Sequence, residues 1–166
     1  MSINQLLPKA TTLTKKQYYN ILAEKKYGEY YITHKLDGER VILFISNEYC
    51  GYLTTTKWTS IQVKGKITFS AIFDCELYCG TFYIFDIIRL ILMEINGAAT
   101  KYTMDLYKVP FLLRYKCLRE YQDVFEALDV NEYKIKIKSF IKLGAVYSYT
   151  LDLLNEEKTS YLRDGI

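Results

Sequence analysis

The sequence predicts an α+β fold: a mainly antiparallel sheet with helices packed on it. Short β-rich segments fill residues 29–90 and are separated by turn residues, while helical patterns lie on either side of that stretch. Half of the residues are hydrophobic and only two are proline, which indicates a folded chain with a core of its own. At 166 residues, we expect one domain over residues 1–166.

The first half of the chain divides into one helix and a series of strands. Thr14-Lys15-Lys16-Gln17 has the spacing of a capping box, and the apolar residues after it recur at helical spacing through about residue 26. Turns are expected at residues 46–47, 64–66 and 79–80. They separate the expected strands 29–36, 40–46, 49–56, 61–64, 68–78 and 81–90.

The second half returns to helical patterns around one further strand. We expect a loop over residues 93–104 and a helix over residues 109–128, with Pro110 in its first turn. Residues 133–141 alternate lysines with isoleucines, which predicts a strand with a charged face and an apolar face. A last helix is expected over residues 151–161.

Bulk properties limit the function classes. The net charge of +3 permits an anionic ligand but is too small to mark a nucleic-acid-binding protein by itself. The four cysteines form no CxxC pair and only one histidine accompanies them, so the pattern indicates buried thiols in a reducing compartment and no zinc site. No signal-peptide pattern is visible, and the most apolar stretch, residues 82–93, is too short to span a bilayer. We therefore expect a soluble, cytoplasmic protein with no membrane partner.

Lys35-Leu36-Asp37-Gly38-Glu39-Arg40 combines a lysine, an acid, a glycine and an arginine between two expected strands. A lysine at the lip of a tight turn can be partly desolvated, which lowers its pKa and makes its amine a nucleophile. Arg40 stays charged and can hold nucleotide hydroxyls or phosphates. The alternative is an ordinary hairpin with a solvated turn.

Carboxylates recur inside the apolar strands that follow. Asp74 and Glu76 lie on one face of an otherwise apolar strand, Asp86 ends an aromatic-rich segment, and Asp164 is near the last residue. A buried carboxylate requires a metal, an arginine or a ligand hydroxyl nearby. Structural salt bridges or capped turns would explain each of these acids equally well.

The order of these motifs resembles that of the covalent nucleotidyltransferases, which include mRNA capping guanylyltransferases and ATP-dependent DNA and RNA ligases. KxDGxR, DxEL, an aromatic strand ending in Phe-Asp and DGI follow one another in this chain, and the resemblance covers residues from about 5 to 166. It implies that Lys35 attacks the α-phosphate of a nucleoside triphosphate and forms a lysyl-nucleotide. It also implies that Arg40 contacts the ribose, Glu76 the ribose or a metal, Phe85 the base, and Asp164 a magnesium or manganese ion.

Within that superfamily, the bare Cys79-Gly80 turn between Glu76 and Asp86 is similar to capping enzymes of the poxvirus and yeast linear plasmid kind, whereas ligases place a long insertion there. Residues 111–118 are similar to the arginine-bearing helix of both branches. Residues 136–140 are similar to the capping family's lysine-x-phenylalanine strand, although lysines also protect solvated sheet edges.

This resemblance implies an mRNA guanylyltransferase with GTP as substrate. Its expected partners are the 5′ end of RNA and further capping-enzyme domains or subunits. The alternatives are the adenylation domain of a DNA or RNA ligase, and a catalytically dead module that binds an RNA end or a partner subunit.

The chain ends on Asp164-Gly165-Ile166, where an apolar residue after a turn predicts a further strand. The resemblance places the family's last core motif and its OB-fold domain beyond Ile166, which indicates a C-terminally truncated domain. Because that domain closes over the site and excludes water, we expect this piece alone to bind nucleotide weakly and to guanylylate itself poorly or not at all.

Overall fold

The computed structural model describes residues 14–23, 31–92 and 102–142. These residues divide into two compact units, one formed by 38–138 and the other by 14–37 with 139–142. Each unit is described by itself. The structure confirms the α+β class with a mixed, mostly antiparallel sheet, and the single domain stays a prediction.

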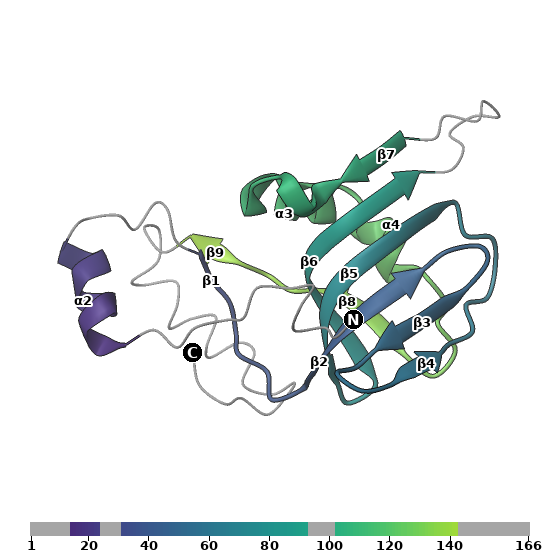
Figure 1. The fold of residues 1–166 in the computed structure, drawn as a ribbon, viewed down its shortest axis with the longest axis horizontal. Coiled ribbons are helices and arrows are strands. Elements are labelled where there is room, and N and C mark those ends of the chain that lie inside the picture. The colour runs from purple at the N-terminus through teal and green to yellow at the C-terminus, as the bar shows by residue number, and fades with distance from the viewer. Residues whose placement is uncertain (1–13, 24–30, 93–101, 143–166) are drawn as a thin grey trace. The chain divides into compact units, whose positions relative to one another are not determined.

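The first unit is built on a seven-stranded sheet (Figure 1). Its strands follow the order β4-β3-β2-β5-β6-β7, with every neighbouring pair antiparallel, and β8 adds to β6 in parallel. The bounds are β2 Glu39–Ile45, β3 Cys50–Leu53, β4 Trp58–Ser60, β5 Phe69–Tyr78, β6 Thr81–Leu92, β7 Tyr102–Asp105 and β8 Lys134–Ile137.

The hairpin of β5 and β6 is the centre of this sheet, and the sequence prediction for it is confirmed. Its two-residue turn has positive φ at both Cys79 (47°) and Gly80 (71°), as a turn matching the strand twist requires. Alternation along β8 is confirmed as well: Lys134 and Lys136 are exposed, while Ile135 and Ile137 are buried.

One strand prediction and one loop prediction are wrong. The strand expected at 61–64 lies earlier, at β4, where Trp58 pairs with Leu53 and its indole covers Gly51. Part of the loop expected at 93–104 is β7, because β6 runs on to Leu92 and offers its edge to Tyr102–Asp105. A local pattern cannot show that a neighbouring strand is long enough to recruit a partner.

The helix expected over 109–128 is interrupted. A 3-10 turn, η2 (Leu106–Lys108), leads to α3 (Phe111–Glu120) and α4 (Gln122–Glu126), and Tyr121 between them has φ −104° and ψ 15°. Pro110 is the N-cap residue of α3 and does not lie inside its first turn. Apolar residues continue at helical spacing through the break, so periodicity alone could not reveal it.

Aromatic rings fill the core between the sheet and the helices. Phe125 of α4 lies edge-on to Phe69 and Phe73 of β5, with ring centroids 5.1 and 5.0 Å apart. These three rings and Phe82 are among the largest fully buried side chains. This core buries one face of β2, β5 and β6, and the charged side chains lie on the other face.

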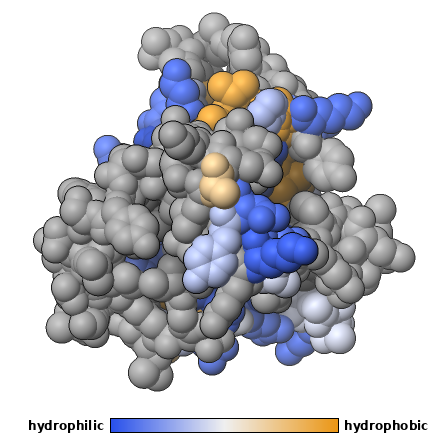
Figure 2. Space-filling model, turned by 90° about the vertical axis from the view of Figure 1, so that its left-hand side faces the viewer, coloured by the Kyte–Doolittle hydropathy of each residue, from blue (hydrophilic) through white to orange (hydrophobic). Residues whose placement is uncertain are grey.

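The second unit contains α2 (Lys15–Ala23) and a short pair of strands, β1 (Tyr31–Ile32) and β9 (Ile141–Lys142). The capping box is confirmed: the Thr14 N–H donates to Gln17 Oε1 (2.8 Å), and the Gln17 N–H donates to Thr14 Oγ1 (3.3 Å). Most of the described residues visible in Figure 2 are hydrophilic, with a smaller apolar group among them.

The hairpin expected around Asp37-Gly38 is wrong. β1 pairs with β9, more than a hundred positions away in the sequence, while β2 pairs with β3 and β5. The helix expected at 151–161 lies outside the described residues. Of the cysteines, Cys75 and Cys117 are buried as expected, but Cys79 is exposed in its turn. None of the helices that the structure describes is long and apolar enough to cross a membrane.

Candidate functional site

The face of the sheet opposite the main core combines charged and apolar side chains. Strand alternation places Arg40 of β2 on this face together with Asp74 and Glu76 of β5, because Arg40 pairs with Glu76 and Ile42 with Asp74. Ile42 forms a second apolar cluster there with Phe44, Leu53, Ile72 and Ile88. The prediction that Asp74 and Glu76 share a face is confirmed.

Arg40 and Asp74 form a bidentate ion pair. Arg40 Nε lies 3.0 Å from Asp74 Oδ1, and Arg40 Nη2 lies 2.6 Å from Asp74 Oδ2. The Asp74 side chain is only 4% exposed, whereas that of Arg40 is 35% exposed. Burial raises the pKa of the Asp74 carboxyl, the hydrogen bonds from Arg40 oppose this rise, and the charge of Asp86 adds to it. The hydrogen bond to Asp74 raises the pKa of Arg40.

Glu76 joins the start of β2 to the end of β8. Its Oε1 accepts a hydrogen bond from the Gly38 N–H (3.0 Å), and its Oε2 lies 3.4 Å from Lys138 Nζ. A Cβ at residue 38 would come within 2.7 Å of the Leu77 carbonyl oxygen and 2.8 Å of Glu76 Cγ. Gly38 is therefore needed for close approach to β5, and not for the hairpin turn that the sequence predicted.

Phe85 occupies an irregularity in β6. Cys75 pairs with Ile84 and Asp74 with Asp86, so Phe85 is an extra residue with no partner on β5. Such a bulge changes the direction of a side chain. The guanidinium carbon of Arg40 lies 5.7 Å from the centroid of the Phe85 ring, and Lys138 Nζ lies 5.9 Å from it. The half-buried ring thus has two cations over it at cation–π distance.

Asp86, next to Phe85, belongs to a second bidentate pair. Arg114 of α3 donates from Nε to Asp86 Oδ1 and from Nη2 to Asp86 Oδ2, both at 2.7 Å, and its Nη1 donates to the Val109 carbonyl oxygen. The guanidinium also lies over the ring of Phe111, 5.8 Å from its centroid. Arg114 therefore fixes α3 to β6 beside the bulge.

The structure brings together three of the residues expected to bind nucleotide, Arg40, Glu76 and Phe85. Lys35 is exposed and belongs to the other unit, three positions before Gly38 in the sequence. Asp164 lies outside the described residues. Among the residues that the structure describes, no group of three or more His, Cys, Asp or Glu side chains is placed to hold a metal ion.

Sequence reasoning gave no role in the site to Asp74, which binds Arg40, and did not place Lys138 beside Glu76. Strand alternation did place Asp74 on the face of Glu76, with an arginine among its possible partners, but it did not identify that arginine as Arg40, which follows from the register of β2 on β5. Lys138 depends on the parallel pairing of β8 with β6, in which its N–H donates to the Ile84 carbonyl oxygen (2.7 Å). No local sequence pattern predicts the pairing of β8 with β6.

No protein-family model matches this chain, and a search of curated proteins found no match either. The class that the described residues define is an α+β protein. One face of its mostly antiparallel sheet packs on the main core, and the other carries an arginine, two carboxylates, a lysine and an aromatic ring beside a smaller apolar cluster.

Proposed function

We propose that this chain is a covalent nucleotidyltransferase of the mRNA guanylyltransferase type, with Lys35 as the nucleophile. The observation that carries the proposal is the grouping of Arg40, Glu76, Phe85 and Lys138 on one face of the sheet. Lys35 is close to these residues in the sequence, because it precedes Gly38 by only three positions. We also propose the nucleotidyltransferase core as the fold.

The proposed chemistry has two steps. The neutral amine of Lys35 attacks the α-phosphorus of GTP, so that a P–N bond forms, the bond to the bridging oxygen breaks and pyrophosphate leaves. A terminal phosphate oxygen of a 5′-diphosphate RNA end then attacks the same phosphorus. The P–N bond breaks, GMP passes to the RNA, and Lys35 recovers its amine.

Arg40 and Phe85 supply the nucleotide-binding surface in this proposal. The Phe85 ring stacks on the base, and stacking of this kind contributes about 1–3 kcal/mol. Asp74 holds two nitrogen atoms of the Arg40 guanidinium, so the cation is fixed next to the ring, where it can contact the ribose. The arginine therefore loses little conformational entropy when the nucleotide binds.

A divalent cation, magnesium or manganese, would neutralise phosphate charge and orient the leaving group. Asp164 is the residue proposed to hold it. Both oxygens of Glu76 already have partners, the Gly38 N–H and Lys138, and this favours the ribose over the metal as the contact of Glu76. Glu76 would ligate the cation only by giving up Lys138.

Lys138 supports guanine over adenine. Its ammonium group lies over the Phe85 ring, 5.9 Å from the centroid, and can only donate hydrogen bonds. Guanine presents the acceptors O6 and N7 on one edge, whereas adenine presents an amino donor in place of O6. A base stacked on Phe85 with this edge toward Lys138 is therefore bound better when it is guanine.

The test is covalent labelling with α-labelled GTP or ATP and manganese, followed by denaturing electrophoresis. We expect weak label from GTP that is lost in Lys35→Ala and kept in Lys16→Ala, a matched exposed lysine of α2. Label from ATP only would replace the proposal with the ligase alternative. If GTP neither labels the protein nor binds to it in equilibrium dialysis, the proposal is wrong. Binding without label would identify a catalytically dead module.

A further inference from the structure

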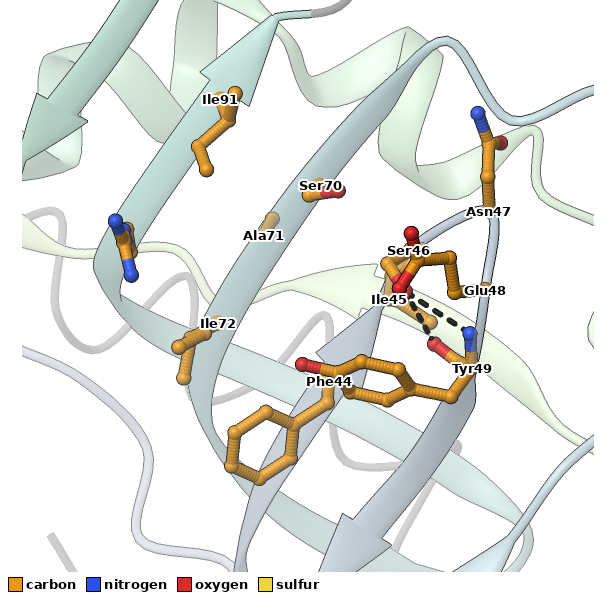
Figure 3. A pocket seen from close by; sticks show the side chains of 11 residues that line it. Phe44, Ile45, Ser46, Asn47, Glu48, Tyr49, Ser70, Ala71, Ile72 and Ile91 are labelled. Carbon is orange, nitrogen blue, oxygen red and sulfur yellow. Dashed lines mark hydrogen bonds between the residues drawn. The ribbon is translucent and has the colours of Figure 1, made fainter.

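A cavity of about 340 Å³ lies farther along the same strands (Figure 3). Phe44 of β2, Ile72 of β5 and Ile91 of β6 line it, and Tyr49 extends over it from the turn between β2 and β3. Arg89 of β6 is its one cationic lining residue. The other lining residues are Ile45, Ser46, Asn47, Glu48, Ser70 and Ala71. We refer to this cavity with the adjoining Trp58 as the aromatic groove.

The aromatic rings of the groove are held in place and yet accessible. Trp58 lies edge-on to Phe44 and Tyr49, with centroids 5.4 and 6.5 Å apart, and its Nε1 donates to Ser60 Oγ (3.1 Å). The indole fills the space where a Cβ at Gly51 would meet it at 2.4 Å, so this glycine is required for the ring's position. Tyr49 is nevertheless 57% exposed and Trp58 41% exposed.

These groups match the chemistry of a nucleotide. Fixed, exposed rings over an aliphatic floor favour a flat aromatic ligand, and every base has a face that can stack. Arg89 is exposed and forms no ion pair within the described residues, although Asp105 lies opposite it in the β6–β7 register, so its guanidinium can bind a phosphate. Glu48, on the rim, can accept a hydrogen bond from a base amino group.

We propose that the aromatic groove binds a nucleotide of a single-stranded nucleic acid, with the base stacked on Tyr49 and its phosphate on Arg89. Ser70 in the groove is four residues from Asp74 along β5, or about 13 Å. A nucleic-acid strand bound in the groove can therefore extend along the same face of the sheet to Phe85. The proposal that this nucleic-acid strand is the acceptor RNA rests on the proposed function. The proposal that the groove binds a single-stranded nucleic acid does not.

Trp58 provides a direct probe, because it is the only tryptophan in the chain. We would titrate the protein at low salt with a short oligouridylate and follow tryptophan fluorescence. Saturable quenching is expected. Tyr49→Ala should weaken binding about fivefold or more, and Tyr49→Phe should bind like the wild type because it keeps the stacking ring. Arg89→Ala should reduce the slope of log K against log salt by about 1.

Matched controls are Tyr19→Ala and Arg119→Ala, which remove an exposed ring of α2 and an exposed cation of α3. Thermal unfolding verifies that each variant is folded. The proposal is overturned if the oligonucleotide causes no quenching, or if folded Tyr49→Ala binds as tightly as Tyr19→Ala.

Covalent labelling with GTP in the same variants separates this proposal from the enzymatic one. Label retained in Tyr49→Ala, together with weakened strand binding, supports the groove. If strand binding is intact in a protein that GTP neither labels nor binds, the groove stands and the guanylyltransferase proposal is wrong.

Discussion

Two arginine–aspartate pairs lie on neighbouring strands, and they differ in what they connect. Asp74 and Asp86 are directly opposite in the β5–β6 register, and each accepts two hydrogen bonds from one guanidinium. Arg40 comes from the next strand and lies beside Phe85, whereas Arg114 comes from α3 and also binds the Val109 carbonyl oxygen. The first pair shapes a binding surface, and the second attaches a helix to the sheet.

The two pairs also differ in how deeply their side chains are buried. In the first, the carboxylate is almost fully buried and the arginine is accessible, with exposures of 4% and 35%. In the second, Asp86 and Arg114 are about equally covered, with exposures of 22% and 19%. A buried carboxylate depends more strongly on its partner, because desolvation penalises the charge that remains. The same pairing geometry thus carries different energies on the two strands.

Arg40→Met should have the largest effect on stability. It leaves the buried Asp74 carboxylate without its partner, and breaking such pairs costs about 3–5 kcal/mol when both members are buried. Because Arg40 is partly exposed, we expect about 2–3 kcal/mol, measured by urea unfolding. GTP binding should weaken as well. The double variant Arg40→Met with Asp74→Asn should recover part of the stability but not the binding, and equal losses in both variants would contradict this account.

Arg114→Met should destabilise the protein less, by about 1–2 kcal/mol, because water can reach the remaining Asp86 carboxylate. The lost contacts are those of α3, so hydrogen exchange should increase first in residues 111–120. Arg119→Met is the matched control on the exposed side of the same helix. A loss as large as that of Arg40→Met would show that the two pairs are energetically equivalent.

The Arg40–Asp74 pair could be predicted from the sequence more fully than the Arg114–Asp86 pair. Asp74 and Arg40 lie within local β patterns, so alternation predicts their face, but the pairing follows only from the register of β2 on β5. The extra residue Phe85 arises from register shifts within the hairpin, and no residue type marks them. The capping box at Thr14 and the Cys79-Gly80 turn were predictable, because neighbours in sequence satisfy each of them.

Long-range pairing explains the remaining failures. β1 pairs with β9, and the contact of Lys138 with Glu76 depends on β8 joining β6 in parallel. Alternating lysines and isoleucines predicted a strand over 133–141 but not its neighbour. The position of Lys138 at Phe85 therefore could not be predicted from the sequence.

Lys138→Met tests the binding surface around Arg40 and Phe85, and it leaves both arginine–aspartate pairs in place. It removes one donor beside Phe85 and leaves Glu76 bonded to the Gly38 N–H. On the proposed function, preference for GTP over ATP should fall by about fivefold to tenfold, equivalent to about 1 kcal/mol, in competition binding. Lys136→Met, two residues earlier on β8 and exposed, should leave the preference unchanged. An unchanged preference in Lys138→Met would exclude this lysine from base selection.

The smallest effect concerns pH. Because burial raises the pKa of Asp74 above its unfolded value, the native state holds this proton more tightly than the unfolded chain does. The stability that this proton contributes is fully present below the unfolded pKa, about 4, and is lost as pH rises through the folded pKa. The free energy of unfolding of the wild type, compared with Asp74→Asn, should therefore decrease across that window.

Asp86→Asn sharpens this test, since the charge of Asp86 is one cause of the raised pKa. Removing it should lower the Asp74 pKa and move the window to lower pH, while Asp123→Asn, an exposed acid of α4, should not move it. Urea unfolding at a series of pH values measures both variants. A difference between wild type and Asp74→Asn that grows in favour of the wild type with rising pH would show that Arg40 outweighs burial. The two pairs would then differ in position and not in electrostatics.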